Sequence, residues 1–185
     1  MYIPVILGTA RVGRKSEKAA NFVLSEVIRF GTKTNLIDVR DYLTGVTDNT
    51  LINTQSKKLS REITKADGII IVSPEYNHGY PGELKIMLDM LYGEYHYKPV
   101  GICGVSIGKL GGARMVEQLR LVLIELHMIP IREAIYFGNI SNLFDSNGLL
   151  TDPSYKQSMR TFLEELHWYT KILKTARVKK GKVNK

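Results

Sequence analysis

The stretch GIIIV at residues 68–72 decides the fold. It holds four consecutive β-branched residues and no polar side chain. A strand with one face in water would alternate apolar and polar residues. An uninterrupted apolar run is instead typical of a parallel strand that is buried on both faces. We therefore expect a parallel β-sheet with this run near its centre.

Strand-like and helix-like segments alternate on both sides of this run. The other expected strands are at residues 2–7, 35–39, 100–105 and 129–137, and the expected helices are at 16–30, 51–66, 82–92, 111–127 and 155–177. Apolar side chains recur at helical spacing in the first helix, and Ser16 is placed to cap its start. Five strands alternating with five helices predict an α/β fold, in which a five-stranded parallel sheet has helices on both faces.

The composition is that of an ordinary soluble protein with one domain. The chain has 185 residues, of which 44% are hydrophobic and 24% charged. No run approaches the roughly 20 apolar residues that a membrane-spanning helix needs, and no signal sequence precedes the first expected strand. The single cysteine, Cys103, excludes an internal disulfide and fits a reducing compartment. We expect a cytoplasmic protein with no membrane span.

The positive charge is concentrated at the C-terminus. The formal net charge is +8, and residues 171–185 carry seven Lys or Arg and no acid, which leaves about +1 on the rest of the chain. We expect a single domain over residues 1–178 and a disordered basic tail at 179–185. A nearly neutral body argues against a nucleic-acid partner. A solvated tail is the main interpretation, and contact with an anionic surface or partner is the alternative.

The loop after the first expected strand has the residues of a phosphate site. In open parallel sheets, ligands bind beyond the carboxyl ends of the strands. Residues 7–16 read LGTARVGRKS, with two glycines, two hydroxyls and three cations at the start of a helix. The loop resembles a nucleoside triphosphate P-loop, but Arg14 stands where that motif has its lysine. Asp38, the candidate for a metal-binding carboxylate, is also a weak match.

Two further loops leave neighbouring strands at the same edge of the sheet. Residues 73–82 read SPEYNHGYPG, in which two prolines and two glycines fix the backbone course while tyrosines supply flat surfaces. This composition suits a planar heteroaromatic ring better than a triphosphate. Residues 106–115 read SIGKLGGARM, where glycines at a helix start allow a ligand to approach the backbone closely.

Together these loops resemble those of the NAD(P)H-dependent FMN reductase family, flavodoxin-like proteins that include quinone, azo-dye and chromate reductases. Residues 8–14 match the family pattern Gly-Ser-x-Arg-x-Gly-Arg, with Thr9 in place of the serine. Residues 74–82 match the family's flavin-ring loop almost letter for letter, and Leu84-Lys85 with Asp89 resembles the opening of its dimer helix. The likeness runs from Tyr2 to about Ile135.

The resemblance implies a flavodoxin-like three-layer sandwich that binds FMN, with NADPH or NADH as co-substrate. The family's functional residues carry over to three groups in this sequence. The phosphate would be bound by Thr9, Arg11 and Ser16 with Lys15 nearby, the ring lined by Pro74, Glu75, Tyr76 and Asn77, and its other side supported by Ser106, Gly108, Gly111 and Gly112.

The implied reaction passes a hydride from NAD(P)H through FMN to a quinone-like, azo or other small electron acceptor. Because the flavin carries this chemistry, we expect no catalytic acid–base residue and no metal. Three alternatives stay open: a non-enzymatic FMN electron carrier, a flavin-based sensor whose tail engages an anionic partner, and a P-loop phosphotransferase.

Residues 84–92 and 115–128 are apolar on more than one helical face. Such helices need a second surface to pack against, which is either a deep core or a partner molecule. We favour a homodimer built on these two helices, with a tetramer left open.

Overall fold

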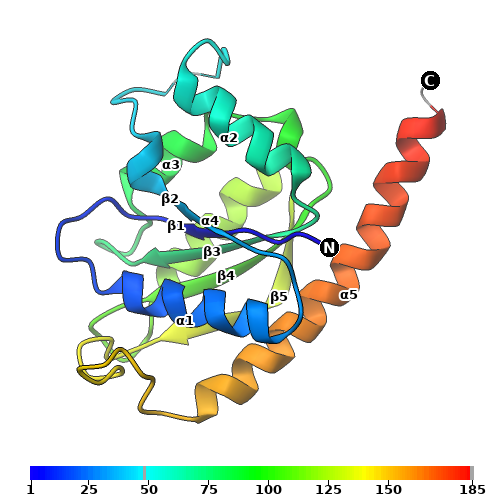
Figure 1. Ribbon diagram of the computed structural model, residues 1–185. Helices are drawn as coiled ribbons and strands as arrows, with labels where there is room; N and C mark the ends of the chain where they lie inside the picture. The colour runs from blue at the N-terminus through cyan, green and yellow to red at the C-terminus, as the bar shows by residue number, and fades with distance from the viewer. Residues whose placement is uncertain (48, 184–185) are drawn as a thin grey trace.

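The computed structural model describes residues 1–47 and 49–183, with side chains placed up to residue 179. The described residues form the expected α/β sandwich around a five-stranded parallel sheet in the order β2-β1-β3-β4-β5 (Figure 1). The strands are β1 (Val5–Leu7), β2 (Leu36–Asp38), β3 (Ile69–Pro74), β4 (Pro99–Val105) and β5 (Ile129–Phe137).

Strand β3 occupies the middle of the sheet, as the run at residues 68–72 predicts. Its side chains are buried alternately on the two faces. Ile69 and Ile71 pack in the core under α2, α3 and α4, while Ile70 and Val72 pack in the core under α1 and α5. Every position therefore needs an apolar residue, which explains why the run has no polar interruption.

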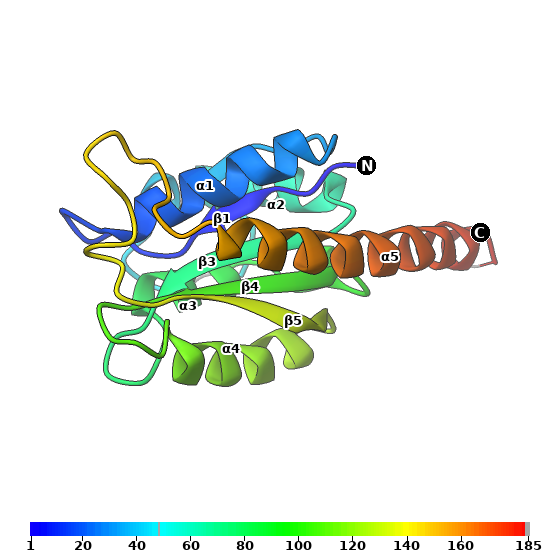
Figure 2. The same ribbon diagram turned by 90° about the horizontal axis from the view of Figure 1, so that it is seen from below.

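Five α-helices cover the two faces of this sheet. They are α1 (Ser16–Arg29), α2 (Thr54–Lys65), α3 (Gly82–Leu88), α4 (Ala113–Glu125) and α5 (Ser154–Val183), with short 3₁₀ helices η1 (Val39–Tyr42) and η2 (Gly93–Tyr95). Figure 2 shows α1 and α5 in front of the sheet and α2 and α3 behind it. Within the described residues, no helix combines the length and apolar character that crossing a membrane requires.

Ser16 does not cap helix α1, so that expectation is wrong. Lys15 is the N-cap residue, and Ser16 is the first helical residue. A capping side chain must come from a residue just before the helix, because only there does it reach the unpaired amides of the first turn. The Ser16 hydroxyl is instead buried without a hydrogen-bond partner.

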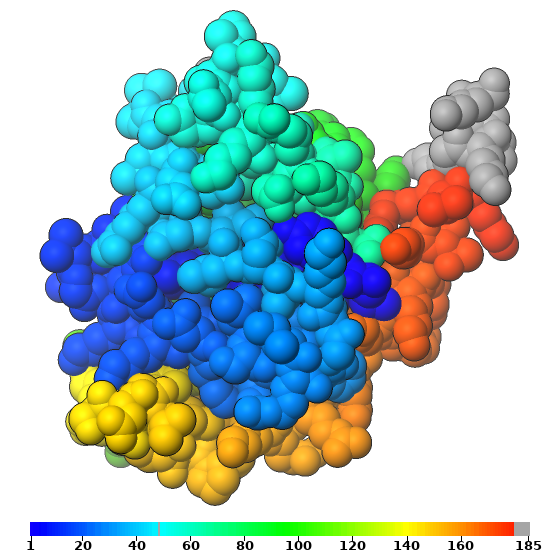
Figure 3. Space-filling model, viewed as in Figure 1, coloured from blue at the N-terminus to red at the C-terminus, as the bar shows by residue number. Residues whose placement is uncertain are grey.

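Helix α5 runs to Val183, beyond its expected end at Arg177. The tail expected to be disordered at residues 179–185 is thus helical up to residue 183, and Asn184 and Lys185 lie outside the described residues. Lysine is a good helix former, and nothing before Gly181 interrupts the helix. The part of α5 that is coloured red in Figure 3 lies at one side of the molecule.

The two apolar helical stretches differ in how the single chain buries them. In α3, Leu84, Met87 and Leu88 are fully buried in the core, so the monomer itself accounts for its apolar character. In α4, Leu121 and Ile124 are exposed. A partner molecule that packs against these helices would therefore contact the outer side of α4.

Candidate functional site

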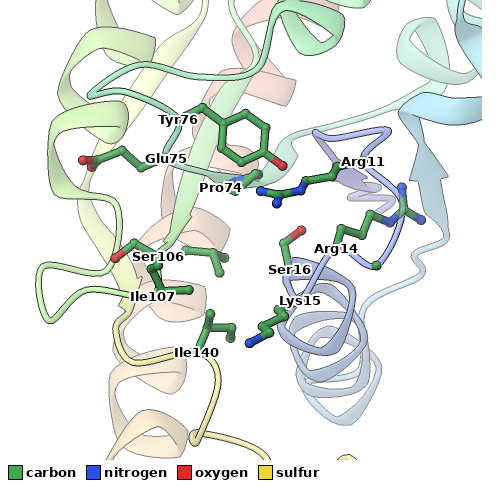
Figure 4. A pocket seen from close by; sticks show the side chains of 12 residues that line it. Arg11, Arg14, Lys15, Ser16, Pro74, Glu75, Tyr76, Ser106, Ile107 and Ile140 are labelled. Atoms are coloured by element: carbon green, nitrogen blue, oxygen red, sulfur yellow. The ribbon is translucent and has the colours of Figure 1, made fainter.

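A cavity of about 290 Å³ opens at the carboxyl ends of β1, β3 and β4 (Figure 4). The three loops singled out in the sequence meet there, because parallel strands end at the same edge of the sheet. Twelve residues line it: Arg11, Gly13, Arg14, Lys15, Ser16, Pro74, Glu75, Tyr76, Val105, Ser106, Ile107 and Ile140.

Arg14 holds the first loop to the end of β2. Its Nη1 donates to Asp38 Oδ1 at 2.7 Å and to the Thr9 carbonyl at 2.6 Å, and its Nη2 donates to the second carboxylate oxygen of Asp38. Its side chain is 2% exposed. Burial works to raise the pKa of Asp38, but hydrogen bonds from Arg14 and from the Arg40 amide outweigh it, and the pKa lies below its usual value.

The ion pair between Arg14 and Asp38 shows how this loop differs from a P-loop. The residue in place of the P-loop lysine is engaged with a carboxylate and with the loop backbone. Asp38, the only carboxylate weighed as a metal ligand, is the partner in that pair. The arrangement fixes the loop's shape and offers no magnesium site built on Asp38.

A second carboxylate, Glu83, holds the loop from the side of α3. Its Oε1 accepts hydrogen bonds from the Ala10 amide at 2.8 Å and from the Thr9 hydroxyl at 3.0 Å. The Thr9 proton is used in that bond, so the Tyr76 hydroxyl, 3.0 Å from Thr9 Oγ1, must donate to it. Thr9 is thus completely buried and links two loops, and it does not line the cavity.

The cavity side of the first loop carries positive charge and an unused hydroxyl. Arg11 and Lys15 are exposed there, and α1 directs the positive end of its dipole at the same place. Lys15 Nζ donates to Ser141 Oγ at 2.7 Å. The Ser16 hydroxyl points into the cavity between Arg11 and Lys15 (Figure 4). A buried hydroxyl without a partner costs free energy, and a bound anion would supply the missing acceptor.

The second loop closes in a tight turn over residues 76–79. Tyr76 and Gly79 exchange two backbone hydrogen bonds of 2.9 Å, and Asn77 and His78 both have positive φ angles, of 50° and 68°. Positive φ at both central positions is the pattern of a type I′ turn. Asn77 sits in this turn and does not line the cavity. The turn presents the Tyr76 ring to the cavity, where the Arg11 guanidinium lies 5.8 Å from its centre.

Glu75 contributes to the cavity wall while its carboxylate points away from the cavity (Figure 4). The carboxylate accepts from the Met115 amide and from Arg114 Nη1, both at 3.4 Å, and so contacts the first turn of α4. Its backbone amide donates to the Val105 carbonyl at 2.9 Å. Glu75 therefore joins the second loop to the third.

The glycines of the third loop serve packing against the sheet. A Cβ on Gly111 would lie 2.5 Å from the Tyr136 carbonyl carbon, and one on Gly112 would lie 2.8 Å from the Val105 nitrogen. Both have positive φ angles, of 60° and 85°. Ser106 lines the cavity, and its hydroxyl donates to the Gly108 carbonyl at 2.8 Å. The glycines let α4 begin close to β4 without lining the cavity themselves.

Seven of the twelve site residues expected from the sequence line the cavity: Arg11, Lys15, Ser16, Pro74, Glu75, Tyr76 and Ser106. The other five, Thr9, Asn77, Gly108, Gly111 and Gly112, shape the surrounding loops.

Sequence reasoning missed Glu83, Ile107 and Ile140. The available signal for Glu83 was an acid in the first turn of a helix, a position usually explained by the helix dipole. For Ile107, the signal was an apolar residue in the loop at residues 106–115, because an exposed apolar side chain in such a loop is unusual. Ile140 follows Ile135, near which the motifs recognised in the sequence end, and nothing nearby in the sequence marks it.

Other reactive groups lie away from this cavity or are inert. Cys103 is fully buried in β4, and burial raises the pKa of its thiol, as expected for a small core residue. Within residues 1–47 and 49–183, no three His, Cys, Asp or Glu side chains gather into a group that could hold a metal ion.

Comparisons with known proteins agree with this architecture. The family model for NADPH-dependent FMN reductase matches residues 1–142. The chain is 32% identical over 147 residues to an NAD(P)H-dependent FMN reductase of Saccharomyces cerevisiae, covering 69% of this chain and 76% of that one. It is 30% identical over 123 residues to a quinone reductase of Pseudomonas putida, covering 63% and 65%. The match to a 2-hydroxy-1,4-benzoquinone reductase of a Burkholderia species is 30% over 116 residues, covering 60% and 63%. The chain therefore spans just under two thirds of these last two relatives.

Solved structures are similar over nearly the whole chain. FerB, a flavoenzyme NAD(P)H:(acceptor) oxidoreductase from Paracoccus denitrificans, superposes with a TM-score of 0.78 at 20% identity, covering 94% of this chain and 97% of that one. A flavodoxin of Streptococcus pneumoniae superposes with a TM-score of 0.57 at 14% identity, covering 90% and 98%. At these identities the likeness shows the flavodoxin-like fold.

Proposed function

The chain belongs to the NADPH-dependent FMN reductase family, and on that premise we propose that it is an NAD(P)H-dependent oxidoreductase that binds FMN in the cavity. The observation that carries the proposal is the buried, unpartnered Ser16 hydroxyl. It lies at the positive end of α1, between two exposed cations, in a cavity whose other walls are largely flat or apolar.

The residues present fit the two ends of FMN. At the phosphate end, Ser16 would donate its hydroxyl proton while Arg11 and Lys15 would supply positive charge. At the ring end, Pro74, Tyr76, Ile107 and Ile140 offer the apolar surfaces that a planar ring packs against. Ser106 supplies a polar group next to this apolar wall.

The remaining predicted residues act through the shape of the loops, together with Glu83, Arg14 and Asp38. Thr9 and Glu83 hold the first loop against Tyr76, and Arg14 with Asp38 holds its other end. Asn77 sits in the turn that presents Tyr76, and Gly111 and Gly112 let the third loop approach the sheet. A loop fixed at several points is preorganised, so less binding free energy is lost in ordering it.

Bound FMN would supply the redox chemistry, accepting a hydride from NADPH or NADH and passing it to a small acceptor. The protein's part is to bind and orient. Among the described residues that line the cavity, only Glu75 has a carboxylate, which points away from the cavity and bonds to α4 (Figure 4). We therefore assign no acid–base step to a side chain. Quinone-like, azo and other small compounds are the proposed acceptors, and the names of the quinone reductase relatives favour the first.

We also propose that the molecule works as a homodimer. The surface available for it is the outer side of α4, where Leu121 and Ile124 are exposed, together with the exposed Tyr92 just beyond α3. Leu121 and Ile124 are three residues apart on α4, and neighbouring exposed apolar side chains are typical of an interface between subunits.

The phosphate end is tested by comparing FMN with riboflavin, which lacks the phosphate, in calorimetric titrations. We expect FMN to bind at least about 100-fold more tightly, because two cations, a hydroxyl and a helix N-terminus act on the phosphate alone. The variant Arg11→Gln should weaken FMN binding and leave riboflavin binding unchanged. Lys57→Gln, an exposed lysine on α2, is the matched control and should change neither. Equal affinity for the two flavins would refute the assignment of this loop.

A further inference from the structure

The C-terminal part of α5 carries a surface that the proposed function does not use. Lys174 Nζ donates to Asp67 Oδ2 at 2.9 Å, and Arg177 donates to the carbonyls of Tyr97 and Asp67 at 2.6 and 2.9 Å. These bonds fix the direction in which the helix leaves the body. Towards its C-terminal end the helix extends away from the sheet (Figure 1).

The C-terminal segment of α5 is positively charged and contains no acidic residue that would offset this charge. No acid follows Glu165 in the sequence, whereas seven Lys or Arg lie in residues 171–185. Lys171, Lys174 and Arg177 follow one another at a spacing of three residues, which places like charges next to each other on the helix surface. Lys171 and Lys179 are exposed. Asp67 offsets the charge of Lys174, and an anionic surface outside the chain would offset that of the exposed lysines.

Apolar side chains share the outward face with these lysines. Trp168 is 60% exposed, Ile172 48% and Val178 54%. Trp168, Ile172 and Lys179 fall within one narrow stripe at helical spacing, and Lys171 and Val178 fall within the next. We call these five residues the C-terminal face.

We propose that the C-terminal face binds the surface of a bilayer that contains anionic phospholipid. Lysines would contact the anionic headgroups while Trp168, Ile172 and Val178 enter the boundary between headgroups and acyl chains. A nucleic acid would satisfy the lysines, but its phosphates offer nothing for Ile172 and Val178 to bury against. This combination of aliphatic, aromatic and cationic side chains favours lipid.

The topology keeps such contact compatible with the proposed cofactor site. The cavity lies at the carboxyl ends of the strands, and α5 runs back from there towards their amino ends. The C-terminal face therefore lies at the opposite end of the sheet from the cavity (Figure 1). A molecule attached to lipid through this face leaves its cavity open to solvent.

Trp168 is the single tryptophan of the chain, so its fluorescence reports directly on this face. The full-length protein is mixed with vesicles of phosphatidylcholine alone, or of phosphatidylcholine with phosphatidylglycerol. Sedimentation measures binding, and the emission wavelength measures insertion. We expect binding and a blue shift with the anionic vesicles only, and both should weaken as salt is added.

Three pairs of substitutions test the C-terminal face, and the first two separate it from general positive charge. Lys171→Gln with Lys179→Gln should weaken binding about 30-fold, since each lysine near an anionic surface contributes about fivefold. Lys57→Gln with Arg61→Gln removes the same charge from the exposed side of α2 and should change binding less than about threefold. Ile172→Ser with Val178→Ser should reduce both binding and the blue shift. Circular dichroism would verify that each variant is folded.

Four results would overturn the proposal. They are binding without a shift in Trp168 emission, equal binding to neutral vesicles, a shift caused by duplex DNA but not by vesicles, and a shift that depends on protein concentration without lipid. The last of these would instead assign the face to a second copy of the chain.

Discussion

Arg14 and Asp38 bond to each other through both ends of the guanidinium and both oxygens of the carboxylate. This pair joins the base of the first loop to the last residue of β2. Arg40 strengthens the junction, because its side chain donates to the carbonyls of Ala10 and Arg11 at 3.1 and 2.6 Å. The shape of the proposed phosphate loop thus depends on side chains that bond to each other and to the loop backbone.

Removing Arg14 should destabilise the protein strongly. Arg14→Met leaves the Asp38 carboxylate half-buried without its main partner, and we expect the free energy of unfolding to fall by about 2–4 kcal/mol. Urea unfolding at neutral pH measures this loss. In the double variant with Asp38→Asn, part of the loss should be recovered, because no unpaired charge remains. A single variant within about 0.5 kcal/mol of the parent would contradict this account of the pair.

The same pair should shape the stability of the protein in acid. The pKa of Asp38 is lower in the folded protein than in the unfolded chain, so its contribution is fully present above the unfolded value of about 4. It is lost as the pH falls through the lower, folded value. Asp67 behaves in the same direction, since bonds from Lys174 and the Tyr2 amide outweigh the effect of burial on its pKa. In Asp38→Asn, unfolding free energy measured below pH 4 should fall less steeply than in the parent, and an identical slope would count against the pair.

Replacing Ser16 should separate binding from stability. Ser16→Ala removes a buried hydroxyl that has no partner, so the protein without flavin should keep or slightly gain stability. FMN affinity should fall about tenfold, because one hydrogen bond to the phosphate is lost. Ser56→Ala is the control, since its buried hydroxyl already donates to the Asn53 carbonyl. It should lower the melting temperature and leave the FMN affinity unchanged. The opposite pattern would place Ser16 outside the binding site.

Glu83 should act on FMN binding through the position of the loop. In Glu83→Ala, the Ala10 amide and Thr9 hydroxyl lose their common acceptor, and we expect about tenfold weaker FMN binding. Glu83→Gln keeps one acceptor oxygen and should restore most of the affinity. Tighter binding in Glu83→Ala would show that the carboxylate competes with the phosphate for the loop donors.

Two glycines with positive φ angles should respond very differently to alanine. A Cβ on Gly111 meets backbone atoms of Tyr136, whereas one on Gly13 has nothing within 4 Å. Gly111→Ala should therefore cost about 3 kcal/mol or more, and Gly13→Ala only the conformational cost of about 1 kcal/mol. Thermal unfolding compares the two. Similar losses would mean that the third loop can move away from β5.

The sequence predicted the sheet and the place of the site because both follow from short-range patterns. The run at residues 68–72 determines a strand buried on both faces, and three unusual loops follow strands that end at one edge. The FMN reductase family and the flavodoxin-like fold were recognised from the same loops, and the comparisons confirm both.

The remaining features depend on contacts between distant residues. Nothing in the sequence around Glu83 shows that Thr9 and Ala10 lie beside it, 74 and 73 residues earlier. Gly111 was interpreted as a close approach to a ligand, but its neighbour is Tyr136 on β5. Ser16 would cap α1 only if the helix began one residue later, and local sequence does not fix the first helical residue that closely. The direction in which α5 leaves the body depends on bonds from Arg177 to the carbonyls of Asp67 and Tyr97, which are distant in the sequence.

An anaerobic absorbance titration tests whether the protein binds FMN and passes electrons to it from a nicotinamide nucleotide. The purified protein is first mixed with FMN and separated from free flavin, and its visible spectrum is recorded. NADPH is then added, followed by NADH in a parallel sample. We expect a bound-flavin spectrum that bleaches with at least one of the two nucleotides and returns when benzoquinone is added. Bound flavin that neither nucleotide bleaches would contradict a reductase and indicate a carrier or sensor. Failure to retain flavin would contradict the assignment of the cavity itself.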